Sequence, residues 1–249
     1  MAVILAISSQ VAYGRVGLSA YSFALQKLGH ELIALPTVNW LTHPKLAGQN
    51  SGKPIGEVTD ADKLADMGAA LISLRLEEKI DWVMSGYFVN AAQAHSVKWL
   101  VTQLKSKNPD IKYCCDPVMG DVPNGLYVAE DVAQYIKNSL APLADLLTPN
   151  QFEADYLDSF RNKQILYKTA TANIFSDNGN EISQAFTPVD VHMNGAGDLL
   201  AALFIGYQLN GVSAPKALEK ATEFLQLCAQ YWRQHDCQQL PVIELQDYL

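Results

Sequence analysis

Segments with the pattern of buried β-strands alternate with segments of helical periodicity, and this alternation restricts the possible folds more than any other feature. The predicted strands are Ala2–Ile7, Glu31–Val38, Asp81–Ser85, Ile111–Cys115 and Asp145–Thr148, and the predicted helices between them are Gly17–Leu28, Asp60–Lys79, Ala91–Lys105 and Ala129–Leu140. Strands that alternate with helices of this length form right-handed βαβ units. The sequence therefore predicts an α/β protein with a mainly parallel central sheet flanked by helices.

The last third of the chain has a different pattern. Short strands are predicted at Gln164–Lys168, Thr171–Phe175 and Glu181–Phe186, and helices at Gly197–Leu209 and Ser213–Gln234. The first of these helices is apolar on nearly every side, so we expect it to be buried. A length of 249 residues favours one large domain or one domain with a small appendage, and the order of the motifs described below predicts a single domain that spans residues 1–249.

Composition and charge exclude several classes of protein. The formal net charge is −8 and no dense Lys/Arg stripe is present, which argues against nucleic acid or an anionic membrane surface as a partner. The apolar run Ala2–Ile7 is too short for a signal peptide and Leu199–Tyr207 too short for a membrane span, so we expect a cytoplasmic protein. The four cysteines have neither a disulfide framework nor zinc-site spacing.

A polar stretch at residues 41–56 has several Gly and Pro residues and no periodicity. Such a composition is typical of a surface loop. The sequence predicts a loop or lid here, able to close over a bound substrate.

Polar residues follow several of the predicted strands. In open parallel sheets, ligands bind beyond the carboxyl ends of the strands. The residues at these ends are Ser8 and Ser9, the region of His43, Ser85–Tyr87, Asp116–Gly120 and Thr148–Glu153. Each has a structural alternative: Asp116 before a proline is also a turn residue, and Asn150 with Glu153 is also the pattern of a helix capping box.

The segment Asn194–Asp198, with sequence Asn-Gly-Ala-Gly-Asp, is the strongest local signal. Two glycines at the start of a helix let the backbone N–H groups approach an anion, and Asp198 stands where a carboxylate can reach a hydroxyl group beside a bound phosphate. The alternative is a glycine turn with an acidic residue in the first helical turn. The segment matches neither a Walker A loop nor a G-x-G-x-x-G fingerprint, and the G-x-x-G of Gly14–Gly17 also lacks the fingerprint.

Taken in order, these motifs resemble those of the pyridoxal kinases in the ribokinase-like superfamily. The resemblance rests on Ile7–Gly14, Leu35–Val38, Ser85–Tyr87, Cys115–Gly120, Thr148–Glu153 and Gly195–Asp198, and it extends from Ala2 to about Gly211. It implies a three-layer ribokinase-like fold and ATP-dependent phosphorylation of the 5′-hydroxymethyl group of pyridoxal, pyridoxine or pyridoxamine. It further implies MgATP as co-substrate, leaves open a monovalent cation such as K⁺, and suggests a homodimer.

The same resemblance implies roles for individual residues. It makes Asp198 the catalytic base and places the backbone of Gly195, Ala196 and Gly197 around the charge that develops during transfer. It implies that the vitamin is contacted by Ser9, His43 and Tyr87. It places Asp116, Thr148 and Glu153 around the nucleotide phosphates, with Asp116 and Glu153 near Mg²⁺, and it implies that Lys168 contacts the nucleotide. Around His43 the neighbouring residues, Thr42 and Pro44, differ from the family pattern.

One departure from the family concerns length. Fourteen residues lie between Glu153 and Lys168, where family members have a longer segment, and a full helix plus a strand is hard to fit there. Three other functions stay open. They are a hydroxymethylpyrimidine kinase of the same superfamily, a vitamin- or nucleotide-binding protein with weak catalysis, and an α/β interaction protein with a vestigial pocket.

Overall fold

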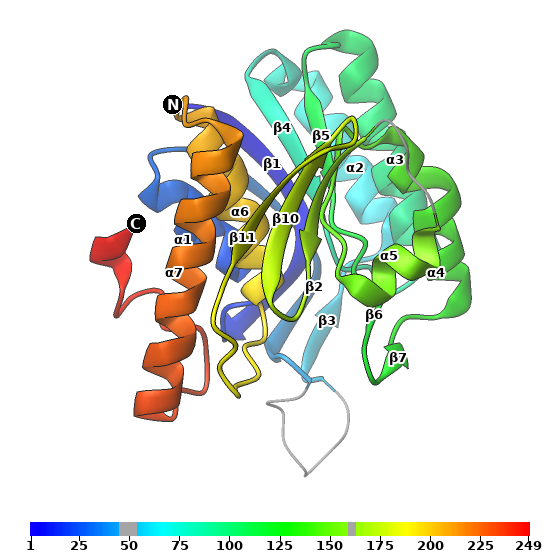
Figure 1. The fold of residues 1–249 in the computed structure, drawn as a ribbon. Helices are drawn as coiled ribbons and strands as arrows, with labels where there is room; N and C mark the ends of the chain where they lie inside the picture. Colours follow the sequence, from blue (N-terminus) through cyan, green and yellow to red (C-terminus); the bar gives the residue numbers. More distant parts are fainter. Residues whose placement is uncertain (45–53, 159–162) are drawn as a thin grey trace.

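The computed structural model describes residues 1–44, 54–158 and 163–249 (Figure 1). The strands are β1 (Val3–Tyr13), β2 (Glu31–Thr42), β3 (Gly56–Val58), β4 (Ile80–Ser85), β5 (Lys112–Cys115), β6 (Gly120–Asp121), β7 (Gly125–Leu126), β8 (Leu146–Leu147), β9 (Gln164–Lys168), β10 (Ala172–Asp177) and β11 (Asn180–Ala185). The helices are α1 (Leu18–Lys27), α2 (Ala61–Ser73), α3 (Ala91–Lys107), α4 (Glu130–Tyr135), α5 (Gln151–Leu157), α6 (Ala196–Leu209) and α7 (Ala214–His235).

The central sheet follows the predicted α/β pattern. Its strand order is β11-β10-β9-β8-β5-β4-β1-β2-β3. The pairs from β9 through β8, β5, β4 and β1 to β2 are parallel, whereas β3, β10 and β11 join through antiparallel pairs. The chain runs from β1 outward to β2 and then returns to β4 on the other side of β1. The switch point of the topology therefore lies between β1 and β4, where such folds bind ligands.

Helices cover both faces of the sheet, as Figure 1 shows, with α1, α6 and α7 on one face and α2, α3 and α4 on the other. Each face has its own apolar core. Helix α6 is buried from Leu199 to Tyr207, which confirms the expectation from its apolar surface. Because α6 is held on every side, its N-terminus has a fixed position relative to the strand ends.

Several boundaries differ from the sequence prediction, among them the ends of β1, β2 and α2. β1 continues past Ile7 to Tyr13, and β2 continues past Val38 to Thr42, because these two strands pair with each other along this whole length. The pairing of β1 with β4 ends earlier, at Ser85. The helix predicted to reach Lys79 ends at Ser73, because Arg75 adopts a left-handed conformation with φ 57°.

Part of the predicted loop at 41–56 belongs to the sheet. Leu41 and Thr42 are the last residues of β2, and Gly56 begins β3, which pairs antiparallel with β2. Residues 45–53, the middle of the predicted lid, lie outside the described residues.

The short segment after Glu153 does hold a helix and a strand. Helix α5 has only seven residues, and β9 follows it and pairs in parallel with β8. Because α5 begins at Gln151 and has only about two turns, the segment after Glu153 holds the end of a short helix and a strand, in agreement with the expectation that a full helix does not fit there.

Candidate active site

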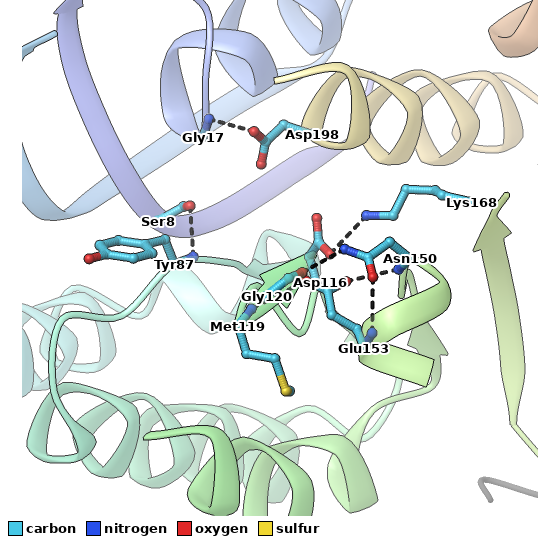
Figure 2. A network of polar contacts seen from close by, with 10 residues as sticks. All are labelled: Ser8, Gly17, Tyr87, Asp116, Met119, Gly120, Asn150, Glu153, Lys168 and Asp198. Carbon is cyan, nitrogen blue, oxygen red and sulfur yellow. Dashed lines mark hydrogen bonds and ion pairs between the residues drawn. The ribbon is translucent and has the colours of Figure 1, made fainter. Parts of the chain in front are cut away.

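The carboxyl ends of β1, β4, β5, β8 and β9 meet the N-terminus of α6, and the predicted site residues gather there (Figure 2). Asp198 lies in the first turn of α6, and its Oδ2 atom accepts a hydrogen bond from the backbone N–H of Gly17 at 2.9 Å. Burial and the charge of Asp116 raise the pKa of Asp198 to about 6, against the lowering effects of Gly17 and Lys168. A carboxyl group with this pKa is ionised at neutral pH yet basic enough to accept a proton.

Gly195 immediately precedes α6 and has φ +87°. An added Cβ atom here would lie 1.9 Å from the carbonyl oxygen of Arg15 and 3.2 Å from a methyl group of Leu240. The position therefore requires glycine on both conformational and steric grounds. The following residues, Ala196 and Gly197, begin the first helical turn. The N–H of Ala196 donates to the carbonyl oxygen of Met193 at 3.2 Å, whereas the next N–H groups of a first turn have no partners from the helix itself. This arrangement can bind an anion.

Lys168, at the end of β9, is paired with Asp116. The Nζ atom lies 3.1 Å from Oδ1 of Asp116, whose side chain is 3% exposed. The same Nζ would lie 2.9 Å from a Cβ atom on Gly197, so the ammonium group also borders the start of α6. Burial opposes the charge of Lys168, but Asp116 and Glu153 outweigh burial and raise its pKa. A positive charge, paired with Asp116, thus stands beside the anion-binding turn.

Glu153 forms the capping box that its sequence pattern offers. Its Oε2 atom accepts from the N–H of Asn150 at 2.8 Å, and its Oε1 accepts from the N–H of Met119 at 3.2 Å. The side-chain oxygen of Asn150 accepts in turn from the N–H of Glu153, and its amide donates to Gly120. Burial raises the pKa of Glu153 to about 8. Glu153 therefore ties α5 to the turn that follows Asp116.

Thr148 lies beside Asp116, because β5 and β8 pair up to Cys115 and Leu147. Its hydroxyl oxygen is buried and has no hydrogen-bond partner within the described part of the chain. Such an atom is costly unless a ligand satisfies it.

The residues predicted to contact the vitamin occupy the ends of β1 and β4. Ser9 is 8% exposed and its Oγ abuts Gly17, where an added Cβ atom would lie 2.5 Å away. Tyr87 donates its N–H to Oγ of Ser8 and packs its ring against Trp40, with centroids 5.8 Å apart. His43 directly follows Thr42, the last residue of β2, and stands three residues after Trp40.

Comparison with known proteins agrees with this geometry. Residues 69–179 match the sequence family described as phosphomethylpyrimidine kinase. Pyridoxal kinase PdxY of Granulibacter bethesdensis is 30% identical over 249 residues, which cover 88% of this chain and 85% of the relative. The chain belongs to the pyridoxal kinase family.

Solved pyridoxal kinases share the fold. The enzyme from Entamoeba histolytica superposes with a TM-score of 0.85 at 20% identity, over 99% of this chain and 94% of that one. The enzyme from Leishmania donovani, in complex with ADP and pyridoxamine, gives a TM-score of 0.80 at 23% identity, over 94% and 88% of the two chains. The predicted ribokinase-like fold is therefore confirmed.

Within this pyridoxal kinase fold, two residues of the candidate active site, Gly17 and Trp40, were not predicted from the sequence. Gly17 supplies the N–H that holds Asp198 and has φ 51°. The G-x-x-G spacing of Gly14–Gly17 is the sequence signal for this contact, although it lacks the dinucleotide fingerprint. Trp40 forms an aromatic pair with Tyr87, and no local pattern distinguishes it from an ordinary strand residue.

A cavity of about 240 Å³ opens next to Lys168 in this member of the pyridoxal kinase family. Its walls come from the end of β9, residues 186–189, the start of α6, and α7. Apolar side chains form much of the lining, including Phe186, Met193 and Leu225.

Proposed function

We propose that this chain transfers the γ-phosphoryl group of MgATP to the 5′-hydroxymethyl group of pyridoxal, pyridoxine or pyridoxamine, as a single ribokinase-like domain acting in the cytoplasm. The observation that carries the proposal is Asp198, fixed by the Gly17 N–H at the N-terminus of α6 and facing the ion pair of Lys168 and Asp116. Family membership supplies the substrate class, since the relative from Granulibacter bethesdensis is named a pyridoxal kinase.

Each element of the site has a task in phosphoryl transfer. Asp198 takes the proton of the substrate hydroxyl as its oxygen attacks phosphorus. The N–H groups at the start of α6 and the ammonium of Lys168 stabilise the charge on the transferred group, because this reaction depends mainly on positioning and electrostatics. The cavity beside Lys168 holds the nucleotide base, and Ser9, Tyr87 and Trp40 enclose the vitamin ring.

The residues around Asp116 fit a magnesium ion that arrives with the nucleotide. Among the described residues no cluster of three or more His, Cys, Asp or Glu is arranged to bind a metal. Mg²⁺ suits such a site because it binds through one or two carboxylates and the substrate phosphates. Asp116 and the unpartnered Thr148 hydroxyl would hold it, and its charge would offset that of the phosphates. Glu153, with both oxygens engaged by backbone N–H groups, would act through water.

The proposal also includes the absence of a membrane partner and the formation of a homodimer. No helix in the described residues is long and apolar enough to cross a membrane. The homodimer and the contact of His43 with the vitamin stay predictions, and light scattering of the purified protein tests the first.

Turnover should depend on pH through Asp198. Because the base must be ionised and burial raises its pKa to about 6, kcat is expected to rise with pH through that value and then level off. A steady-state profile with pyridoxal and saturating MgATP measures this. A rate that stays constant on both sides of that value would show that another group sets the protonation step.

Replacing Lys168 by methionine should raise the KM for ATP by about two orders of magnitude. The change removes a phosphate partner and leaves Asp116 buried without its counter-ion. Lys105→Met is the matched control, because Lys105 pairs with Asp145 at 2.6 Å on the partly exposed rim of α3. Equal KM values for the two variants would exclude Lys168 from the nucleotide site.

The match to the phosphomethylpyrimidine kinase family favours hydroxymethylpyrimidine as the second candidate substrate. Both substrates present a hydroxymethyl group on a heteroaromatic ring, so the same base and anion-binding turn would serve either. Comparing kcat/KM for the two with purified protein decides between them. Binding of pyridoxal with only background ADP formation would indicate a binding protein instead.

A further inference from the structure

Tyr21 is a buried polar side chain that phosphoryl transfer, as described above, does not use. It lies in α1 and is fully buried, with 0% exposure. Its hydroxyl oxygen makes no hydrogen bond of good distance and angle with any of the described residues, although it lies near the carboxylate of Asp198. A tyrosine hydroxyl usually finds a partner when buried, and leaving it without one costs free energy. A phenylalanine would avoid this cost, so the hydroxyl calls for an explanation.

The hydroxyl lies close to residues of the candidate active site. An added Cβ atom on Gly86, just after β4, would be 3.2 Å from the Tyr21 hydroxyl oxygen and 2.5 Å from Oγ of Ser8. The backbone N–H of Tyr21 donates to the carbonyl oxygen of Gly17, whose own N–H holds Asp198. Tyr21 therefore stands at the junction of β1, β4 and α1, next to the segment that positions the base.

Tyr21 and Asp198 are close enough to influence each other. Burial raises the pKa of Tyr21 well above its usual value, and the carboxylates of Asp198 and Asp116 raise it further. The hydroxyl in turn lowers the pKa of Asp198, which burial and Asp116 raise. The other groups that face Asp198 are Lys168 at the end of β9 and Tyr127 after β7. Tyr21 thus keeps its proton and can act only as a donor toward the carboxylate.

We propose that Tyr21 is a positioning residue for Asp198, whose carboxylate accepts a hydrogen bond from the Tyr21 hydroxyl once substrates fill the site. The proposal rests on the proposed function, because it takes Asp198 to be the base. The Tyr21 ring is fixed in the core, whereas Asp198 is half-buried in the first turn of α6 and can adjust. When substrates displace water from Asp198, the Tyr21 hydroxyl replaces it as a donor and keeps the carboxylate ionised.

The test is Tyr21→Phe, which removes only the hydroxyl. The thermal midpoint should stay the same or rise, because an unpartnered buried group is lost. The KM values should not change, whereas the midpoint of the kcat–pH profile should move up by about one unit, which lowers kcat about tenfold on the acidic side. Tyr113→Phe is the matched control. Tyr113 is equally buried but bonded to Oγ of Ser85 at 2.7 Å, so this variant should be less stable with an unshifted profile.

A second measurement tests the hydrogen bond from Tyr21 to Asp198 independently of whether Asp198 is the catalytic base. The carboxyl carbon of Asp198, identified by its loss in Asp198→Asn, is titrated by NMR with pyridoxal and a non-hydrolysable ATP analogue bound. A higher titration midpoint in Tyr21→Phe than in the wild type supports the hydrogen bond whether or not Asp198 is the base. Equal midpoints, or failure of Tyr21→Phe to fold, would overturn the proposal. Wild-type kcat in Asp198→Asn would overturn the assignment of the base instead.

Discussion

Asp198→Asn should lower kcat for pyridoxal phosphorylation by about 10²–10⁴-fold while leaving ATP affinity near the wild-type value. The amide can still accept the hydrogen bond from Gly17, so the start of α6 keeps its geometry, but it cannot take the substrate proton. The thermal midpoint should not fall, because the carboxylate that repels Asp116 is removed. Steady-state kinetics and ADP titration of the purified variant measure these effects.

The control for this variant is Asp81→Asn. The Oδ2 atom of Asp81 also accepts a backbone hydrogen bond, from Val3 at 2.8 Å, but at the opposite end of β1. We expect it to retain wild-type turnover. If Asp198→Asn stayed within about threefold of the wild type, Asp198 would not be the base.

Gly195→Ala should reduce kcat by at least about a hundredfold and destabilise the protein. The residue has φ +87°, and its new Cβ atom would lie 1.9 Å from the carbonyl oxygen of Arg15. Relief of this clash must separate α6 from the Gly14–Gly17 segment, so both the anion-binding turn and the contact of Asp198 with Gly17 would be displaced. Kinetics and thermal unfolding together measure the two effects.

Gly211→Ala provides a matched comparison. Gly211 also has a positive φ, +79°, but an added Cβ atom would meet nothing within 4 Å. This variant should lose about 1 kcal/mol of stability from backbone strain and keep its activity. Identical behaviour of the two variants would mean that the contact of Gly195 with Arg15 has no catalytic importance.

The fold was largely predictable because apolar periodicity and glycine positions report local structure directly. The helix around Leu199–Tyr207 and the strand Gln164–Lys168 both lie where the sequence predicts them. Strand ends were harder to predict, because β1 extends to Tyr13 only through its pairing with β2. His30, just after α1, is buried between the N–H of Ala2 and the carbonyl oxygen of Gly206, two partners that are distant in the sequence.

The site was predictable in its motifs but not in its contacts. Asp198, Asp116 and Lys168 stand at strand ends or a helix N-terminus, and the structure brings them together. The hydrogen bond from Gly17 to Asp198 and the proximity of Tyr21 to Asp198 join residues far apart in sequence, so no local pattern could indicate them. The engagement of Glu153 by backbone N–H groups likewise depends on the turn at Met119.

Direct observation of the product tests the central claim. Purified protein is incubated with pyridoxal, ATP and Mg²⁺, and pyridoxal 5′-phosphate and ADP are quantified together. We predict equal amounts of both products, formed with higher kcat/KM than with hydroxymethylpyrimidine and lost in Asp198→Asn. Background ADP formation with pyridoxal, or a clear preference for hydroxymethylpyrimidine, would contradict the assignment of this chain as an enzyme that phosphorylates vitamin B6.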